Sequence, residues 1–306
     1  MSSPFLLPAS WLRDLAGAML LAASVHAAAL PTDPAAASAS AAAESLRALH
    51  QRVSGKLGRS GFGRPMQLDS QETPGGLQGD IHAVVDHPLS EISAALKQSS
   101  QWCELLTLHV NNRRCRVGTT PQGQDMLTLF VVRRYDKPVE QAFQLPFVYR
   151  VTSATPEYLA VEMNAASGPL GTSNYRVTLE AVALDERRSF LHFGYSYDHN
   201  MMVRMATQAY LATFGRDKVG FTVIGKGADG QPDYIRGLRG LVERNAMRYF
   251  LTLDAHLSSE PGASAERRER LWFAAAEQYP RQLHEAELEA YLAIKREDRQ
   301  RDGAGR

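Results

Sequence analysis

The sequence is poor in features that mark a particular chemistry. Only Cys103 and Cys115 are cysteines among its 306 residues, and no pair of histidines stands near them, so a zinc site is not predicted. The 34 basic residues nearly balance the 33 acidic ones, which argues against a nucleic-acid partner. No internal repeat and no catalytic motif of high specificity is present. With an apolar fraction of 44%, the chain can bury one large core.

Beyond residue 25 no apolar run is long enough to cross a bilayer, and the one short run lies near the N-terminus. Arg13 precedes an apolar stretch at 15–25, and small residues follow at 27–29. A basic residue, an apolar core of about 11 residues and a small-residue site form the secretory pattern, although Asp14 is atypical there. We therefore expect a cleaved signal peptide over 1–27 and a periplasmic or secreted protein. The alternative is an uncleaved N-terminal membrane anchor.

The cysteine pair follows from the expected export. In an exported chain, Cys103 and Cys115 are expected to form one disulfide that closes a short loop. Such a loop stabilises the fold by about 3 kcal/mol in the chain-entropy model. The alternative is a pair of small, buried, reduced side chains.

Composition divides the remaining chain into four parts. Residues 28–43 are rich in Pro, Ala and Ser and are expected to form a disordered linker. A helix and a Gly-containing loop are expected over 44–78, followed by a main domain over 79–257. A charged helical extension over 258–306 should be kinked or split at Pro280.

Period-two alternation dominates the main domain. A strand over 79–85 is followed by Pro88, which suits the first turn of a helix. The later strands have connections too short for crossovers, so antiparallel pairing is expected. The fold class is predicted to be α+β, with a curved antiparallel sheet that grips a long C-terminal helix around a cavity. The further elements expected are strands at 127–135, 142–152, 158–165, 174–184, 190–199 and 218–224, and helices at 201–214 and 235–257.

Three segments give the domain a family resemblance. Residues 79–96 (GDIHAVVDHPLSEISAAL), then Trp102, then the long helix over 235–257 resemble the START-like or helix-grip superfamily. This group includes polyketide cyclase/dehydrase-like and Bet v 1-like proteins. The resemblance implies binding of lipids, sterols or other hydrophobic ligands, and a minority of members are enzymes. The helix at 201–214 and the extension after residue 265 depart from the family pattern.

A polar and aromatic cluster at 195–200 (YSYDHN) is the candidate ligand site. Its alternate residues share a face that could offer hydroxyl and imidazole groups to a ligand head group. The alternative is that the tyrosines are partly buried sheet residues whose hydroxyls reach water, and a one-residue register shift would turn all of them outward. The predicted lining consists of Arg133, Tyr149, Tyr175, Tyr195, Tyr197 and His199.

A catalytic site is not predicted. His199 would need an acid such as Asp198 or Glu162, but neighbours on a strand point to opposite faces. His82 and His87 lack a defined metal geometry. No metal and no cofactor is therefore expected.

Met201, Met202 and Met205 give the helix at 201–214 an adaptable apolar surface. This surface is predicted to be a lid over the cavity or a transient membrane contact, and the alternative is simple packing on the sheet edge. The function predicted is binding or transfer of a hydrophobic, lipid-like small molecule. Two alternatives remain: an enzyme of the cyclase/dehydrase-like type in the same cavity, and a non-catalytic envelope scaffold whose core is filled by its own side chains.

Overall fold

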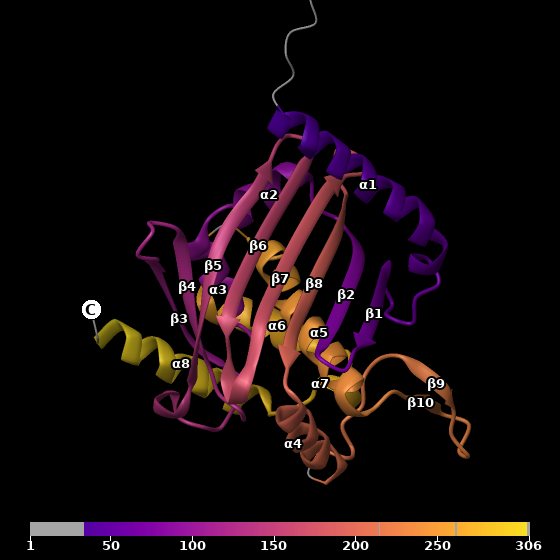
Figure 1. Ribbon diagram of the computed structural model, residues 1–306, viewed down its shortest axis with the longest axis vertical. Helices are drawn as coiled ribbons and strands as arrows, with labels where there is room; N and C mark the ends of the chain where they lie inside the picture. The colour runs from indigo at the N-terminus through magenta and orange to yellow at the C-terminus, as the bar shows by residue number, and fades with distance from the viewer. Residues whose placement is uncertain (1–33, 214, 261, 305–306) are drawn as a thin grey trace, which may run out of the picture. The chain divides into compact units, whose positions relative to one another are not determined.

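The computed structural model describes residues 34–213, 215–260 and 262–304, so the expected signal peptide lies outside the described residues. Eight antiparallel strands form one curved sheet in the order β1-β2-β8-β7-β6-β5-β4-β3 (Figure 1). A separate two-stranded hairpin pairs β9 with β10. The strands are β1 (Met66–Glu72), β2 (Gly76–Val85), β3 (Asn112–Thr119), β4 (Asp125–Val131), β5 (Phe143–Ala154), β6 (Tyr158–Ser167), β7 (Thr172–Ala183), β8 (Ser189–His199), β9 (Val223–Lys226) and β10 (Pro232–Tyr234).

Helices cover both faces of the sheet. α5 lies across the inner face, where it contacts β1, β2 and β8, while α1 packs on the opposite, outer face of β6, β7 and β8 (Figure 1). Two short 3-10 turns, η1 and η2, lie between strands. The bounds are α1 (Pro34–Leu57), α2 (Leu89–Leu96), α3 (Ser99–Leu106), η1 (Val139–Gln141), η2 (Pro169–Gly171), α4 (Met201–Ala212), α5 (Gly237–Leu257), α6 (Ala265–Ala276), α7 (Pro280–Leu283) and α8 (Leu288–Ala304).

The inner face of the sheet carries the main core. Leu179 pairs with both Val161 and Phe193, and all three are buried beneath the helices. Alternate residues turn to the outer face, as the period-two pattern predicts. A sheet that grips one long helix confirms the predicted α+β class and the helix-grip architecture.

The expected linker over 28–43 is wrong in its described part, because α1 begins at Pro34. Alanine is the strongest helix former, and this helix also has apolar sheet to cover. Ala43 and Leu46 are buried in one cluster with Phe190 and Ala160 of the outer face. The helix is therefore a structural layer of the domain.

Several strand bounds also differ from expectation. β1 occupies part of the segment expected to be loop, and β3 was not predicted at all. β4 ends at Val131, four residues before the expected end, while β9 covers only the end of the strand expected over 218–224. Helix α4 and the long α5 lie where the sequence predicts them.

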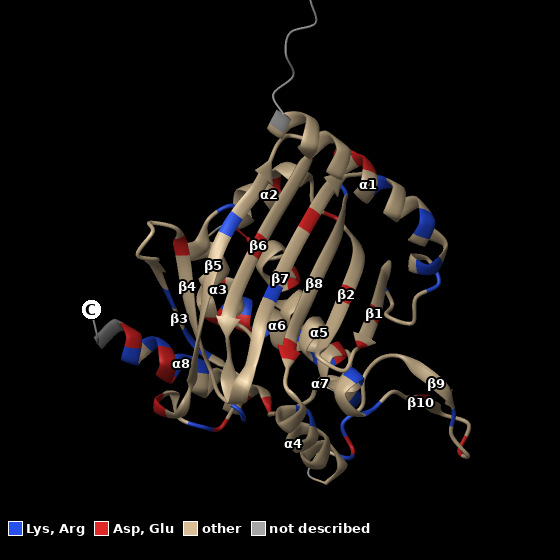
Figure 2. Cartoon of the chain, in the orientation of Figure 1, with Lys and Arg blue, Asp and Glu red and all other residues tan. Residues whose placement is uncertain are grey.

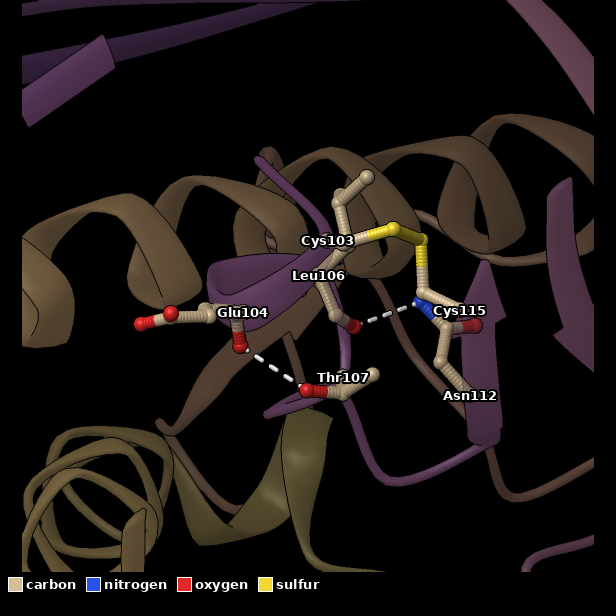
Figure 3. The surroundings of a disulfide bond; sticks show 6 residues. All are labelled: Cys103, Glu104, Leu106, Thr107, Asn112 and Cys115. Atoms are coloured by element: carbon tan, nitrogen blue, oxygen red, sulfur yellow. Dashed lines mark hydrogen bonds between the residues drawn. A yellow bond between two sulfur atoms is a disulfide. The ribbon is translucent and has the colours of Figure 1, made fainter. Parts of the chain in front are cut away.

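The predicted disulfide is confirmed. It joins Cys103 of α3 to Cys115 of β3, with their Cα atoms 5.2 Å apart (Figure 3). Beside it, the amide of Asn112 donates a hydrogen bond to the carbonyl of Leu106 at 2.8 Å. Together these links fix the turn between α3 and the sheet edge.

The C-terminal extension docks on that same corner. Tyr291 of α8 donates to the carbonyl of Leu108 at 2.7 Å, and Arg113 of β3 forms a buried bidentate pair with Asp298. Pro280 begins α7 and separates α6 from α8, so the predicted split is confirmed. Within the described residues, no helix combines the length and apolar character needed to span a membrane.

Candidate functional site

Tyrosine rings lie on the inner face near the η2 end of β7 and β8. Tyr175 of β7 stacks on Tyr197 of β8, with ring centroids 5.1 Å apart and an interplanar angle of 13°. Tyr195 lies tilted against both rings, at 6.4 Å and 5.9 Å. Tyr175, Tyr195 and Tyr197, three of the four tyrosines predicted in the lining, therefore share one face and lie side by side.

Helix α5 completes this cluster with Tyr249, which the sequence analysis missed as a site residue. Its ring lies 5.3 Å from Tyr195 and 4.7 Å from His109, which follows α3. We call Tyr175, Tyr195, Tyr197 and Tyr249 the tyrosine cluster. The 3–4 spacing of apolar residues on α5 placed Tyr249 on the inward face, which was the available signal.

Polar groups of the tyrosine cluster are directed by their neighbours. The hydroxyl of Tyr175 lies 2.9 Å from Thr172 Oγ1, and Tyr195 shares a hydrogen bond with Asn245 of α5. Burial raises the pKa of the Tyr195 hydroxyl well above its usual range. The cluster therefore presents protonated hydroxyls, which can both donate and accept.

His199 stands at the end of β8, on the same face as Tyr197. It pairs across the strands with Thr172, whose hydroxyl meets Tyr175. Its side chain is buried, yet neither ring nitrogen has a hydrogen-bond partner among the residues that the structure describes. Beside Tyr249, Nε2 of His109 is likewise buried and has no hydrogen-bond partner among the described residues. A buried polar atom without a partner costs about 1–3 kcal/mol, so such atoms need an explanation.

Two predicted lining residues lie away from the tyrosine cluster. Tyr149 donates a hydrogen bond to the carbonyl of Leu96 at 2.8 Å, and the indole of Trp102 donates to the same carbonyl at 2.8 Å. Both side chains thus hold the end of α2 against the sheet. Arg133 is exposed in the turn after β4, because the strand ends at Val131 and its alternation does not extend further. Arg133 therefore lies outside the lining in which the sequence analysis placed it.

The predicted cavity is occupied by the protein's own rings. Five pockets among the described residues lie elsewhere, and none of these five is lined by the tyrosine cluster. One of them, of about 580 Å³, lies over the outer face and the β1 edge, beside Asp80, His82 and His192. On the inner face, the rings of the tyrosine cluster contact one another in the region where the cavity was predicted.

The outer face holds a charged network that was not predicted. His192 lies 3.0 Å from Asp80 through Nε2 and 2.9 Å from Glu180 through Nδ1, while Tyr158 donates to Glu180. Burial alone would lower the pKa of His192, but these two carboxylates raise it to about 9. His82 stacks on it at 4.7 Å, and its own pKa is lowered by burial and by the charge of His192. Only strand register, which the sequence does not specify, brings these groups together.

No group of three or more His, Cys, Asp or Glu side chains suited to a metal ion occurs in the described part of the chain. Asp198 also lies on the outer face, where Asn174 donates to it at 2.7 Å. His199 and Asp198 therefore point to opposite faces, as the alternation predicts.

Helix α4 follows His199 directly and is exposed along most of its length. Met201, Met202 and Met205 are 65%, 79% and 63% exposed, and Leu211 is the only buried residue of the helix among those described. The side chain of Asn200 caps its first turn by accepting from the backbone N–H of Val203. The methionine face of α4 therefore lies in water, while Leu211 packs against the domain.

No family model matches the sequence, and no curated protein matches it. Among solved structures, the chain is similar to an aromatase/cyclase from Streptomyces sp. R1128, with 13% identity, a TM-score of 0.33, and coverage of 66% of this chain and 95% of that one. A START superfamily protein from Mycobacterium smegmatis has 12% identity, a TM-score of 0.31, and coverage of 45% and 92%. Norcoclaurine synthase from Thalictrum flavum has 12% identity, a TM-score of 0.33, and coverage of 48% and 89%.

At these identities and TM-scores, the likeness carries no inference about what this chain binds or does. The helix-grip architecture rests instead on the strand order and on the position of α5 against the inner face of the sheet.

Proposed function

We propose that the protein binds a hydrophobic, lipid-like small molecule between the inner face of the sheet and α5, and releases it unchanged. The observation that carries this proposal is the pairing of a ring-lined apolar region with a buried polar end. The tyrosine cluster supplies the apolar surface, and His199 beside it keeps both ring nitrogens unsatisfied within the described residues. A ligand with an apolar body and one polar head group matches both features.

The ligand enters by displacing rings and lifting α4. In the closed structure the tyrosine cluster takes the place of the ligand, so uptake requires the rings to rotate or separate. α4 begins immediately after His199, and its methionines can adapt to apolar surfaces of varied shape. This position makes α4 the lid, with Met201, Met202 and Met205 as its adaptable side chains. Together with the signal-like N-terminus, this describes an exported carrier in the periplasm or outside the cell.

A scaffold is the second candidate, and one observation favours it. The rings of the tyrosine cluster contact one another at centroid distances between 5.1 Å and 6.4 Å, which is the packing of a filled core. In a scaffold, however, nothing offsets the free-energy cost of leaving both ring nitrogens of His199 without hydrogen bonds. An enzyme in the same region receives less support, because Asp198 lies on the outer face.

Native mass spectrometry and lipid extraction of the purified full chain test the proposal. We expect a co-purifying apolar compound, and saturable binding of the fluorescent probe 1-anilinonaphthalene-8-sulfonate to the folded protein. His199→Leu and Tyr197→Phe should weaken probe binding about tenfold or more, since each removes a polar partner at the head-group end. Tyr234→Phe, on the β9–β10 hairpin, serves as the matched control and should bind as the original protein does. A protein without bound compound, whose probe binding is the same in all variants, would support the scaffold instead.

A further inference from the structure

Exposed apolar side chains gather at one end of the sheet. Eight large hydrophobic residues are strongly exposed in the described chain, and only one of them, Val117 of β3, lies outside three neighbouring segments. The segments are η2 with its turn, α4 and β9. Figure 1 shows α4 and the β9–β10 hairpin at the end of the sheet opposite α1. The seven residues are Leu170, Met201, Met202, Met205, Tyr210, Val223 and Ile224.

The turn between β6 and β7 adjoins α4 directly. A side chain at Gly171 would meet Val203 of α4 at 3.3 Å, so the two segments form one continuous surface. Leu170 in that turn has a φ of 60° and is 56% exposed. A leucine in the left-handed region is strained, and here the strain holds an apolar side chain out in solvent. We call these three segments the apolar tip.

The apolar tip is accompanied by positive charge. Residues 200–239 contain six Lys or Arg and three Asp or Glu. Arg204 and Lys218 pair with Glu72 and Glu285 outside this segment, and Arg216 lies 3.7 Å from Asp217, so the positive charge beside the apolar tip comes mainly from Lys226 and Arg236. α4 contains no acidic residue, as Figure 2 shows for its visible surface. Lys226 and Arg236 are exposed, and the side chain of Arg216 is 76% exposed. Apolar side chains with basic neighbours suit an anionic interface.

The base of the apolar tip is rigidly held. Glu243 of α5 is fully buried and accepts hydrogen bonds from the backbone N–H groups of Phe221 and Thr222, at 2.6 Å and 2.9 Å. Its other oxygen accepts from the hydroxyls of Ser70 and Thr222. The start of the hairpin is thereby fixed to α5 and to β1, which presents β9 and α4 on a firm support.

We propose that the apolar tip is a docking surface for an anionic lipid bilayer, where the methionines and β9 enter the interface and the basic residues meet lipid phosphates. The proposal deepens the function above, because the lid helix α4 is part of the surface. A second copy of the chain is a poorer occupant. A two-fold dimer through this surface would place its positive charges against each other.

Vesicle co-sedimentation of the full chain tests the docking surface. The triple variant Met202→Ser, Met205→Ser, Ile224→Ser should partition at least tenfold more weakly into phosphatidylcholine vesicles containing phosphatidylglycerol. The control is Val117→Ser, which removes an apolar side chain that is 49% exposed on another surface and should leave partitioning unchanged. Because the apolar stretch at 15–25 is identical in all variants, it contributes equally to each measurement. Binding should weaken with added salt and on pure phosphatidylcholine.

Hydrogen exchange localises the contact independently of the N-terminal stretch. Vesicles should slow exchange in α4 and β9 relative to the free protein. Equal partitioning of the triple variant and the control would overturn the proposal, as would self-association of the original chain that the triple variant abolishes. Equal binding to neutral and anionic vesicles would overturn the electrostatic part. Probe binding measured without vesicles separates the two proposals through Ile224→Ser alone. Ile224 lies on β9, outside the lid, so this variant should weaken partitioning and leave probe binding unchanged.

Discussion

Replacing His192 with glutamine removes the imidazolium that joins Asp80 of β2 to Glu180 of β7 on the outer face. In the folded protein the imidazolium bridges Asp80 and Glu180 at 3.0 Å and 2.9 Å. Its side chain is only 21% exposed, so solvent screens these contacts weakly. A glutamine can accept or donate hydrogen bonds at this position but carries no charge, and it leaves two carboxylates facing each other.

The magnitude follows from the pKa. The folded protein raises the pKa of His192 from 6.5 to about 9, and this difference corresponds to about 3 kcal/mol of stabilisation of the protonated ring. Because the pKa is higher in the folded state than in the unfolded state, protonation of His192 stabilises the fold. The stabilisation is complete below about pH 6.5, where both folded and unfolded chains hold the proton, and it is lost as the pH rises through about 9.

Urea unfolding at a series of pH values measures this effect. We expect the free energy of unfolding of the original chain to exceed that of His192→Gln by about 3 kcal/mol near pH 6, and the difference to shrink toward about pH 10. Neighbouring His82, whose pKa is lowered by burial and by the charge of His192, contributes only at the acidic end of this window, so the change above about pH 7.5 reports on His192. A difference between the two proteins that stays constant across the window would refute the role of the imidazolium. His87→Gln, at a position of similar exposure outside the network, is the control.

Two further predictions concern the corner at which the C-terminal extension docks. Replacing both Cys103 and Cys115 with serine should lower the free energy of unfolding by about 3 kcal/mol, and reduction of the original chain should reproduce this loss in urea melts. Asp298→Ala should cost about 3–5 kcal/mol, because it leaves the buried guanidinium of Arg113 without its bidentate partner. Adding Arg113→Met to Asp298→Ala should recover much of that loss. A double variant no more stable than the single one would show that the charge is not its cause.

The inner face could be predicted because its signal is local. Period-two alternation along one strand places Tyr195, Tyr197 and His199 on the same side whatever the strand's partners are. Antiparallel pairing follows from the short connections, and burial of one face fixes which side of each strand points inward. The predicted disulfide needed only the expectation of export and a short separation between cysteines.

What the sequence did not reveal depends on contacts between distant segments. The Ala-rich start of α1 resembles a linker until the apolar outer face beside Phe190 is known, since only that face gives the helix something to cover. The pairing of His192 with Glu180 requires the register of β7 against β8. Arg133 was misplaced for a related reason, because an irregularity in the β3–β4 pairing and the end of β4 stop the alternation before it. These features are tertiary, and alternation within one segment does not specify them.

The roles proposed for α4 require the helix to move between two fixed ends. It begins directly after His199, the last residue of β8, and the cap from Asn200 defines its first turn. Beyond the helix, the backbone at 221–222 is held by Glu243. Neither end can travel far while the sheet and α5 stay intact. Displacement of α4 is therefore a swing of the helix rather than unfolding of the domain.

Few contacts oppose that swing. Leu211 is the buried side chain of the helix, and exposing it costs about 1.5–3 kcal/mol. The partly exposed ion pair between Arg204 and Glu72, at 2.8 Å, adds less than about 1 kcal/mol. Insertion of two or three methionines into a bilayer returns a comparable amount, at about 0.8 kcal/mol for each buried methylene. The two proposals together therefore expect an anionic membrane to shift α4 toward the open position, provided that the open helix inserts its methionines more deeply than the closed one.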